Sequence, residues 1–231
     1  MIPIQDTIRA ERWPVVNVAL IALCGYGFWL ELAAGPEIDA FVTRHALIPR
    51  EFLSLAQHGW LRPRVFGPLF TSMFLHASVA HFAGNMLFLW IFGDNVEDRM
   101  GHLGYALFYL VGGAFAGLTQ VAANPGSVVP TVGASGAIAA VMGAYMLLYP
   151  GSRVRTLVWV LFLIRVVDVP AYAWLGFWFL MQLLSSSAAA HGPDQGGVAF
   201  FAHIGGFAFG AMTVLLLGLR RPPRARAQEW R

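Results

Sequence analysis

The chain has 231 residues, of which 58% are apolar and only 12% are charged, and its mean hydropathy is +0.62. This composition excludes an ordinary soluble domain, because soluble domains carry about 25% charged residues. All 15 basic residues are arginine, and the net charge of +3 comes largely from a C-terminal tail directly after an apolar run. The tail therefore indicates a topology anchor rather than a nucleic-acid site, and no nucleic-acid partner is expected.

Several apolar runs are long enough to cross a bilayer, which takes about 20 helical residues. We therefore predict an all-α, polytopic membrane protein with six transmembrane helices, for which the lipid bilayer is the surrounding solvent. The second expected span begins near residue 75 and ends at the sequence GDNVEDRMG, residues 93–101. The other five cover residues 14–34, 103–123, 134 or 135 to 149, 171–188 and 198–219. Residues 1–13 are polar and show no cleavable signal peptide, so the first span is expected to act as its own insertion signal.

Two stretches are predicted to lie at the membrane surface without crossing it. Residues 35–66 are too polar to span and too apolar for a disordered linker, which favours a structured first loop with short amphipathic helices. Residues 156–167, TLVWVLFLIRVV, form an apolar run of only 12 residues that includes Arg165. That length fits an interfacial or re-entrant segment better than a span.

Six spans place both termini on one side of the membrane. More arginines fall on the side of the termini than on the opposite side, which favours the cytoplasm for both ends. The predicted organisation is a cytoplasmic N-terminal segment over 1–13, a six-helix membrane domain over 14–219 and a basic cytoplasmic tail over 220–231. The expected location is a bacterial plasma membrane.

Four polar side chains interrupt the apolar runs: His81, Asn85, Ser135 and His203. Taken singly, a serine in a span usually bonds back to its own helix, and a histidine or asparagine usually holds two helices together. Taken together they indicate chemistry, because polar groups in hydrocarbon are expensive. If one span separates Ser135 from His203, the fourth and sixth spans run parallel and the two side chains share a depth.

Small residues would let these two helices approach closely. Ser135, Ala139 and Gly143 form one stripe at helical spacing, and His203, Gly206 and Gly210 form another. Backbones that pack along such stripes can bring the serine hydroxyl within hydrogen-bond reach of the imidazole. A neutral histidine can then take the proton of the serine, which becomes a nucleophile.

The other two polar residues fit an oxyanion site. His81 and Asn85 are four residues apart and share a helix face. With the backbone N–H groups at the head of the fourth span, they could stabilise a developing oxyanion. No acidic residue in the spans is well placed as a third member of a triad, so the residues predict a Ser–His dyad.

With these residues the chain resembles the rhomboid intramembrane serine proteases. GASGA, which holds Gly133, Ser135 and Gly136, is similar to the family's GxSG motif; HASVAHFAGN contains its HxxxN, and AHIGGFAFG its HxxGxxxG. The resemblance covers about residues 65–215. It implies a six-helix fold and hydrolysis of peptide bonds in or near transmembrane segments of substrate proteins, with Ser135 as nucleophile and His203 as general base. It also implies oxyanion donors in Asn85, His81 and the Ser135 amide, and packing near the site by Gly133, Gly136, Ala139, Gly206 and Gly210.

The chain departs from the family pattern at two places. Gly67-Pro68 stands where many members carry a Trp-Arg pair in the first loop, which affects loop anchoring and not chemistry. Ala139 stands where some members place an aromatic residue that stacks on the histidine. His203 is then expected to be held by another aromatic ring or to be held less firmly.

Two other classes of function are weighed against a protease. An inactive rhomboid-like adaptor would bind client transmembrane helices without cutting them, and the Ser–His pair argues against it. A small transporter or channel would use the polar residues as a pathway, and the lack of mid-membrane acidic residues and of a visible repeat argues against it. No cofactor is expected, and the single cysteine, Cys24, lacks partners for a disulfide or a metal site.

Overall fold

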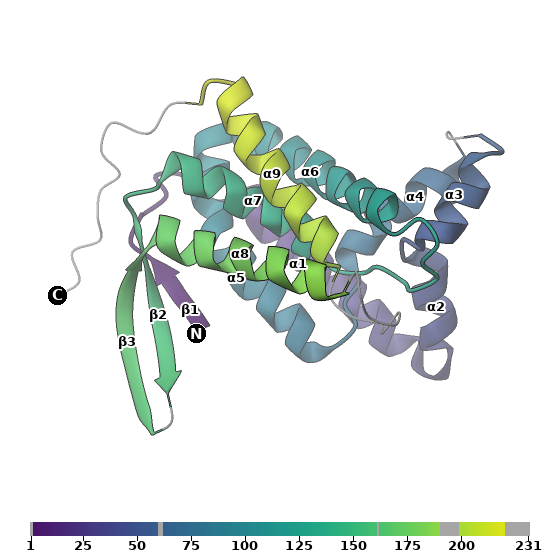
Figure 1. Ribbon diagram of the computed structural model, residues 1–231, viewed down its shortest axis with the longest axis horizontal. Helices are drawn as coiled ribbons and strands as arrows, with labels where there is room; N and C mark the ends of the chain where they lie inside the picture. Colours follow the sequence, from purple (N-terminus) through teal and green to yellow (C-terminus); the bar gives the residue numbers. More distant parts are fainter. Residues whose placement is uncertain (1, 60–61, 161, 190–198, 220–231) are drawn as a thin grey trace.

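The computed structural model describes residues 2–59, 62–160, 162–189 and 199–219, and its described part is mostly helical (Figure 1). The helices are α1 Val15–Ala33, α2 Ile38–His45, α3 Pro49–Ala56, α4 Pro63–Thr71, α5 Val79–Met100, α6 His102–Ala123, α7 Ser135–Leu148, α8 Ala171–Ala189 and α9 Phe200–Leu216, with 3₁₀ turns at Gly35–Glu37 and Ser72–Phe74. The strands are β1 Ile2–Asp6, β2 Arg153–Val160 and β3 Leu163–Pro170. The expected basic tail over 220–231 lies outside the described residues.

The six long helices match the six predicted apolar runs closely. The largest difference is at α5, which begins at Val79 and not near residue 75. The reason is a helix cap: Ser78 is in an extended conformation, and its side chain accepts a hydrogen bond from the His81 backbone N–H at 3.1 Å. Because Ser78 ends the preceding turn, His81 and Asn85 fall in the first two turns of α5.

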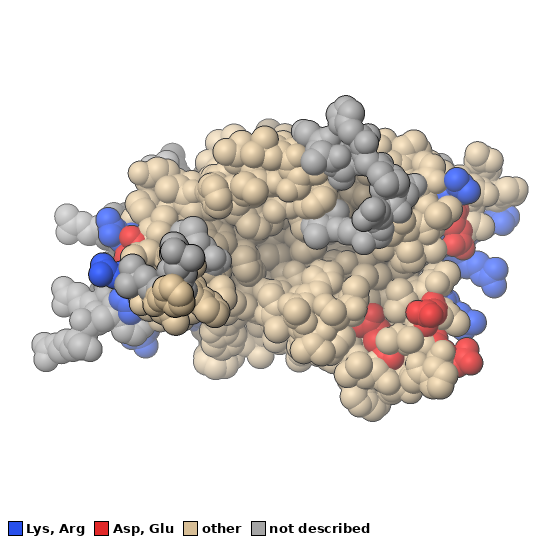
Figure 2. All heavy atoms as spheres, turned by 60° about the horizontal axis from the view of Figure 1, so that its bottom comes forward, with Lys and Arg blue, Asp and Glu red and all other residues tan. Residues whose placement is uncertain are grey.

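Fewer than six of these helices meet the length and hydropathy expected of a membrane span. Within the described residues, α1 and α6 are long and apolar enough by themselves, and the bent pair Pro63–Phe74 and Val79–Met100 is a third candidate. The apolar helices α7 and α9 and the apolar part of α8 are shorter. Six crossings therefore stay a prediction. Figure 2 shows arginine and acidic side chains gathered toward the two ends of one face, with an uncharged zone between them.

The prediction of an all-α protein is wrong in one respect, because the chain also forms a three-stranded antiparallel sheet in the order β1-β2-β3. The apolar run 156–167, expected at the membrane surface, lies in the hairpin formed by β2 and β3. The run is rich in β-branched and aromatic residues, which favour strands. Since Arg153 pairs with Pro170, the hairpin leaves and rejoins the helices at the same end of the molecule (Figure 1).

The prediction of a structured first loop is confirmed by the short helices α2, α3 and α4. Phe52, Val65 and Val121 belong to a small apolar cluster that packs this loop onto α6. Leu47 and Thr131 exchange backbone hydrogen bonds of 3.1 and 2.9 Å, which tie the loop to the stretch just before Ser135. The first loop therefore helps to hold the head of α7 in place.

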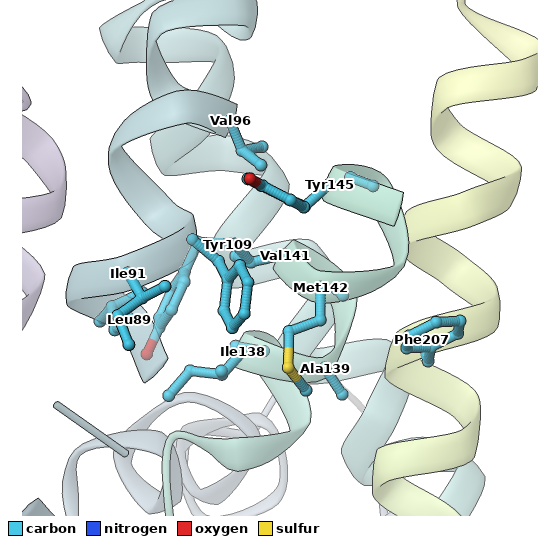
Figure 3. Packing of buried hydrophobic residues seen from close by; sticks show 14 of the residues in the cluster. Leu89, Ile91, Val96, Tyr109, Ile138, Ala139, Val141, Met142, Tyr145 and Phe207 are labelled. Atoms are coloured by element: carbon cyan, nitrogen blue, oxygen red, sulfur yellow. The ribbon is translucent and has the colours of Figure 1, made fainter. Parts of the chain in front are cut away.

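Helix α7 forms the centre of the molecule and is buried along most of its length. Ile138, Val141, Met142 and Tyr145 project from it into the core, and Phe207 of α9 lies on its other side (Figure 3). A helix that is apolar all round is expected in such a buried position. From Ala137 on, α7 is therefore shielded from the surroundings by α5, α6 and α9, which all contact this helix.

Candidate active site

A serine and a histidine from different helices meet at one end of the core. Ser135 is the first residue of α7, and His203 lies in the first turn of α9. The Ser135 hydroxyl oxygen, Oγ, is 2.8 Å from Nε2 of His203, which is a hydrogen-bond distance. The structure thus brings together the two residues that the sequence singled out as a dyad.

Glycines allow this approach, because α7 and α9 touch through their backbones. A Cβ atom added to Gly206 would lie 2.1 Å from the carbonyl oxygen of Gly136 and 3.2 Å from the Cβ of Ala139. A Cβ on Gly210 would lie 1.8 Å from the carbonyl oxygen of Ala140. No side chain fits in such a space, so the small residues named from the sequence lie at the contact that sets the Ser135–His203 distance.

The other ring nitrogen of His203 also has a partner, which the sequence did not indicate. Nδ1 of His203 is 2.8 Å from Oε1 of Gln182, on α8. The ring of Trp178, one turn earlier on α8, lies 5.7 Å from the imidazole between ring centroids, at an interplanar angle of 41°. Of the two ways of holding His203 that Ala139 left open, the structure has the first, with an aromatic ring from another helix.

His81 and Asn85 lie beside the residue that leads into the serine. Gly133 has φ +124°, and a Cβ there would lie 2.7 and 2.8 Å from two atoms of the His81 ring and 3.6 Å from Nδ2 of Asn85. Glycine is required both by this positive φ and by the ring against it. The four predicted site residues therefore gather around one short stretch, Gly133–Ser135.

Asn85 is buried, and its Nδ2 has no hydrogen-bond partner in the part of the chain that the structure describes. Buried donors are rarely left unpaired, so such a group points to a role in binding. An amide N–H that is free and lies beside the serine loop is suited to donate a hydrogen bond to a developing negative charge on a ligand.

A third histidine, His76, lies next to His81 in this site, and the sequence reasoning did not predict it. It is 2% exposed, its ring centroid is 5.4 Å from that of His81, and neither ring nitrogen has a partner among the described residues. Its backbone N–H donates to the buried carboxylate of Glu31 at 2.9 Å, which fixes this turn against α1. Its position five residues before His81 in the stretch HASVAH was the available signal.

A cavity of about 30 Å³ adjoins the serine. Its lining includes Ser72, Met73, Thr131, Gly133, Ser135 and Gly136. A water molecule occupies about 30 Å³ of liquid volume, so the space suits a single small polar molecule. A larger cavity of about 610 Å³ lies between the N-terminal segment and α5, and it contains none of these residues.

The donor atoms near the serine are not arranged as a metal site. Over the described residues, no group of three or more His, Cys, Asp or Glu side chains could hold a metal ion. Cys24 is buried and forms no disulfide. The groups that the structure places near the serine are a hydroxyl, an imidazole and an amide donor.

The sequence of this chain is similar to those of several known proteins. Residues 60–220 match the family model of the Rhomboid domain. The chain is 29% identical over 201 residues to "Rhomboid protein 1, mitochondrial" of Saccharomyces cerevisiae, covering 85% of this chain and 49% of that protein. It is 30% identical over 203 residues to "Rhomboid protease GluP" of Bacillus subtilis, covering 87% of this chain and 33% of that protein. It is 32% identical over 152 residues to "Rhomboid-like protein 11, chloroplastic" of Arabidopsis thaliana, covering 64% of this chain and 51% of that protein.

The region matched by the family model includes His76, His81, Asn85, Ser135, Gln182 and His203. The alignments, however, span about half of these relatives' own length or less. The activities and locations given in these names are therefore properties of the relatives.

Proposed function

Because the chain belongs to the rhomboid family, we propose that it is an intramembrane serine protease, which hydrolyses peptide bonds in or near transmembrane segments of other membrane proteins. The observation that carries the proposal is the distance of 2.8 Å between Oγ of Ser135 and Nε2 of His203. A serine hydroxyl is a weak nucleophile unless a base removes its proton, and this geometry supplies the base.

In the proposed acylation step, Nε2 of His203 takes the hydroxyl proton while Oγ of Ser135 bonds to the carbonyl carbon of the substrate. The carbonyl oxygen becomes an oxyanion. The imidazolium then gives its proton to the leaving amine nitrogen as the C–N bond breaks, which leaves an ester on Ser135 and frees the first product.

The oxyanion needs hydrogen-bond donors placed before the reaction begins. The amide of Ser135 has no helical partner, because it is the first residue of α7. The unpaired Nδ2 of Asn85 and the ring of His81 lie beside Gly133, two residues before Ser135. Donors of this kind typically contribute a factor of about 10²–10³ each to the rate.

Deacylation repeats the proton transfer with water in place of serine. His203 takes a proton from a water molecule, whose oxygen attacks the ester carbon, and then returns that proton to Oγ of Ser135 as the acyl group leaves. The cavity of about 30 Å³ beside Ser135 could admit such a water into an otherwise apolar core.

The proposal includes a topology with six crossings, by α1, α5, α6, α7, α8 and α9, and with both termini in the cytoplasm. Integral membrane character follows from the family and the apolar helices. The relatives include a mitochondrial, a chloroplastic and a Bacillus subtilis protein, so they do not support the expected bacterial plasma membrane over another membrane. The partners proposed are transmembrane protein substrates.

The test compares wild type with Ser135→Ala in liposomes that contain a single-span model substrate. We expect wild type to release a cleaved product and Ser135→Ala to release none, whereas the control Ser185→Ala, a serine on α8, cleaves normally. A fluorophosphonate should label wild type at Ser135. Wild type that retains the substrate helix but neither cleaves it nor reacts with the probe would be an adaptor, and the protease proposal would fail.

A further inference from the structure

Gln182 holds the imidazole of His203 on the side away from Ser135. Oε1 of Gln182 lies 2.8 Å from Nδ1 of His203, and Nε2 of His203 lies 2.8 Å from the hydroxyl oxygen of Ser135. Gln182 and Trp178 are four residues apart on α8 and so share a helix face, which lies against His203. Helix α8 thus presents an amide and an aromatic ring to the same imidazole.

We propose that Gln182 is a positioning residue, which sets both the orientation and the tautomer of His203; this rests on the proposed protease function. A carboxamide oxygen can only accept a hydrogen bond, so Nδ1 must carry the proton and donate it. Nε2 of a neutral ring is then the acceptor, and it faces the hydroxyl of Ser135. The ring is thereby held in the form that can remove the serine proton.

The alternative tautomer shows what Gln182 prevents. With the proton on Nε2, the imidazole would donate to Oγ of Ser135 and could not act as its base. Among the described residues, the partners of the His203 ring nitrogens are the Gln182 amide and the Ser135 hydroxyl and not a carboxylate. The amide of Gln182 takes the orienting role that a buried carboxylate fills in Ser-His-Asp triads, without adding a negative charge.

The position of Gln182 also explains why an amide is tolerated in an apolar helix. An unpaired amide in such surroundings would cost about 1–3 kcal/mol. The bond to His203 satisfies its oxygen, and the same bond satisfies Nδ1 of a buried ring. Each group is the other's partner, so removal of the Gln182 amide leaves Nδ1 of the buried His203 ring unpaired.

Two substitutions separate positioning from packing. Gln182→Met keeps the length of the side chain and removes the carbonyl acceptor, and Gln182→Glu keeps an acceptor at both terminal atoms. Leu180→Met on the same helix is the matched control, since Leu180 is 49% exposed. All are assayed in liposomes with the single-span substrate, with kcat and KM measured separately and with the rate of fluorophosphonate labelling.

We expect Gln182→Met to lower kcat and the labelling rate together by about 10–100-fold, below the roughly 10⁴-fold loss of a triad whose tautomer is wrong. KM should stay within about twofold, because ground-state substrate binding does not involve Nδ1. Gln182→Glu should recover most of kcat. Leu180→Met should behave as wild type.

The pH–rate profile gives a readout that packing does not move. The carboxylate of Gln182→Glu would stabilise the imidazolium, so the acid limb of the profile should shift to higher pH than in wild type. Among the described residues, the other titratable ring that acts on His203 is His81 on α5, and it is unchanged in every variant. The control should keep the wild-type profile.

The proposal is overturned if Gln182→Met keeps the wild-type kcat and labelling rate, or if Gln182→Glu is as slow as Gln182→Met with an unshifted profile. A fall in activity that follows a fall in melting temperature equally in both variants would assign Gln182 to packing alone and would also overturn it. Failure of the protease proposal looks different, because wild type itself would then neither cleave nor label.

Discussion

Asn85 has a buried amide nitrogen without a partner among the described residues, close to the loop that leads into Ser135. Leaving a buried donor unpaired costs about 1–3 kcal/mol in the resting protein. A developing oxyanion would supply the missing acceptor, and the cost would then be recovered only during the reaction. Such a group contributes to kcat more than to substrate binding.

Asn85→Ala should therefore slow turnover by about 10²–10³-fold and still allow labelling of Ser135 by a fluorophosphonate. The measurement is kcat with the model substrate in liposomes, beside the rate of labelling. Asn85→Asp is the matched control: it keeps the size of the side chain and removes the N–H donors, so it should be equally slow. An unchanged kcat in both would make Asn85 a residue that only joins helices.

Sequence reasoning found the site residues that interrupt apolar runs or belong to a motif. Ser135, His203, His81 and Asn85 were found in this way. Gln182 was missed because one amide in a long apolar run is usually explained as helix packing, and the run gives no sign of which face of α8 turns toward α9. Rotation of a uniformly apolar helix is decided by its neighbours, and these are not visible in the local sequence.

Asp6 on β1 is a buried carboxyl at the end of the molecule away from Ser135. Its oxygen Oδ2 accepts a hydrogen bond from the Nδ2 of Asn95 at 3.0 Å and another from the hydroxyl of Tyr145. Burial raises the pKa of Asp6 from 3.8 to about 7. Asn95 also donates to Asp94 on α5, so a second carboxyl faces the same cluster.

This raised pKa predicts a pH-dependent loss of stability. The folded chain holds the Asp6 proton more tightly than the unfolded chain, so stability falls as pH rises from about 4 to about 7 and changes no further above that. Asp6→Asn should not show this pH-dependent loss. The free energy of unfolding of the variant should therefore rise relative to that of wild type by about 2–4 kcal/mol as the pH goes from 4 to 8. Melting temperatures in detergent across this range test it; parallel curves for the two proteins would contradict it.

At the scale of elements, the contact between α7 and α9 decides whether the site can form. The two helices meet through Gly136, Ala140, Gly206 and Gly210, with backbone facing backbone. An added methyl group can be accommodated in this contact only if the two helices move apart. A change that separates the helices also separates Oγ of Ser135 from Nε2 of His203.

Gly206→Ala should therefore lose both stability and activity. Its new Cβ would meet a carbonyl oxygen at 2.1 Å, and overpacking of this kind costs about 1–3 kcal/mol. We expect a lower melting temperature and a loss of fluorophosphonate labelling. Gly176→Ala on α8 is the control, because a Cβ there has nothing within 4 Å. Normal labelling of Gly206→Ala at wild-type stability would show that the contact does not set the site.

The sheet is the element that the sequence did not predict. A short apolar run can be a strand or a buried helix, and periodicity alone does not separate the two. β1 pairs with β2, which lies about 150 residues later in the chain, so no local signal marks it. In the hairpin, Trp159 pairs with Ile164 and both are exposed, and Arg155 and Asp168 form an ion pair of 3.2 Å nearer the helices. The hairpin is thus apolar toward its tip and charged at its base. This order fits the prediction, which stays a prediction, that residues 156–167 lie at the membrane surface.

At the scale of the whole molecule, the site requires that α7 and α9 begin at the same side of the membrane. Ser135 starts α7 and His203 lies in the first turn of α9, so the heads of the two helices meet. Between them the chain passes through the hairpin and α8. Because the hairpin returns to the end from which it left, α8 alone must carry the chain back across (Figure 1).

Three single cysteines test this parity in a Cys24→Ser background. Gly126 lies before α7, Gly151 lies between α7 and β2, and Gly192 lies in the chain between α8 and α9. An added Cβ at Gly126 or Gly151 meets nothing within 4 Å, so both cysteines should be tolerated. Intact bacterial cells that express each variant are treated with a membrane-impermeant thiol reagent. We expect positions 126 and 192 to label in intact cells and position 151 to label only after the membrane is opened. Labelling of 151 and 192 from one side would mean an even number of crossings between them, so that α7 and α9 would begin at opposite faces, about 30 Å apart, and Ser135 could not meet His203.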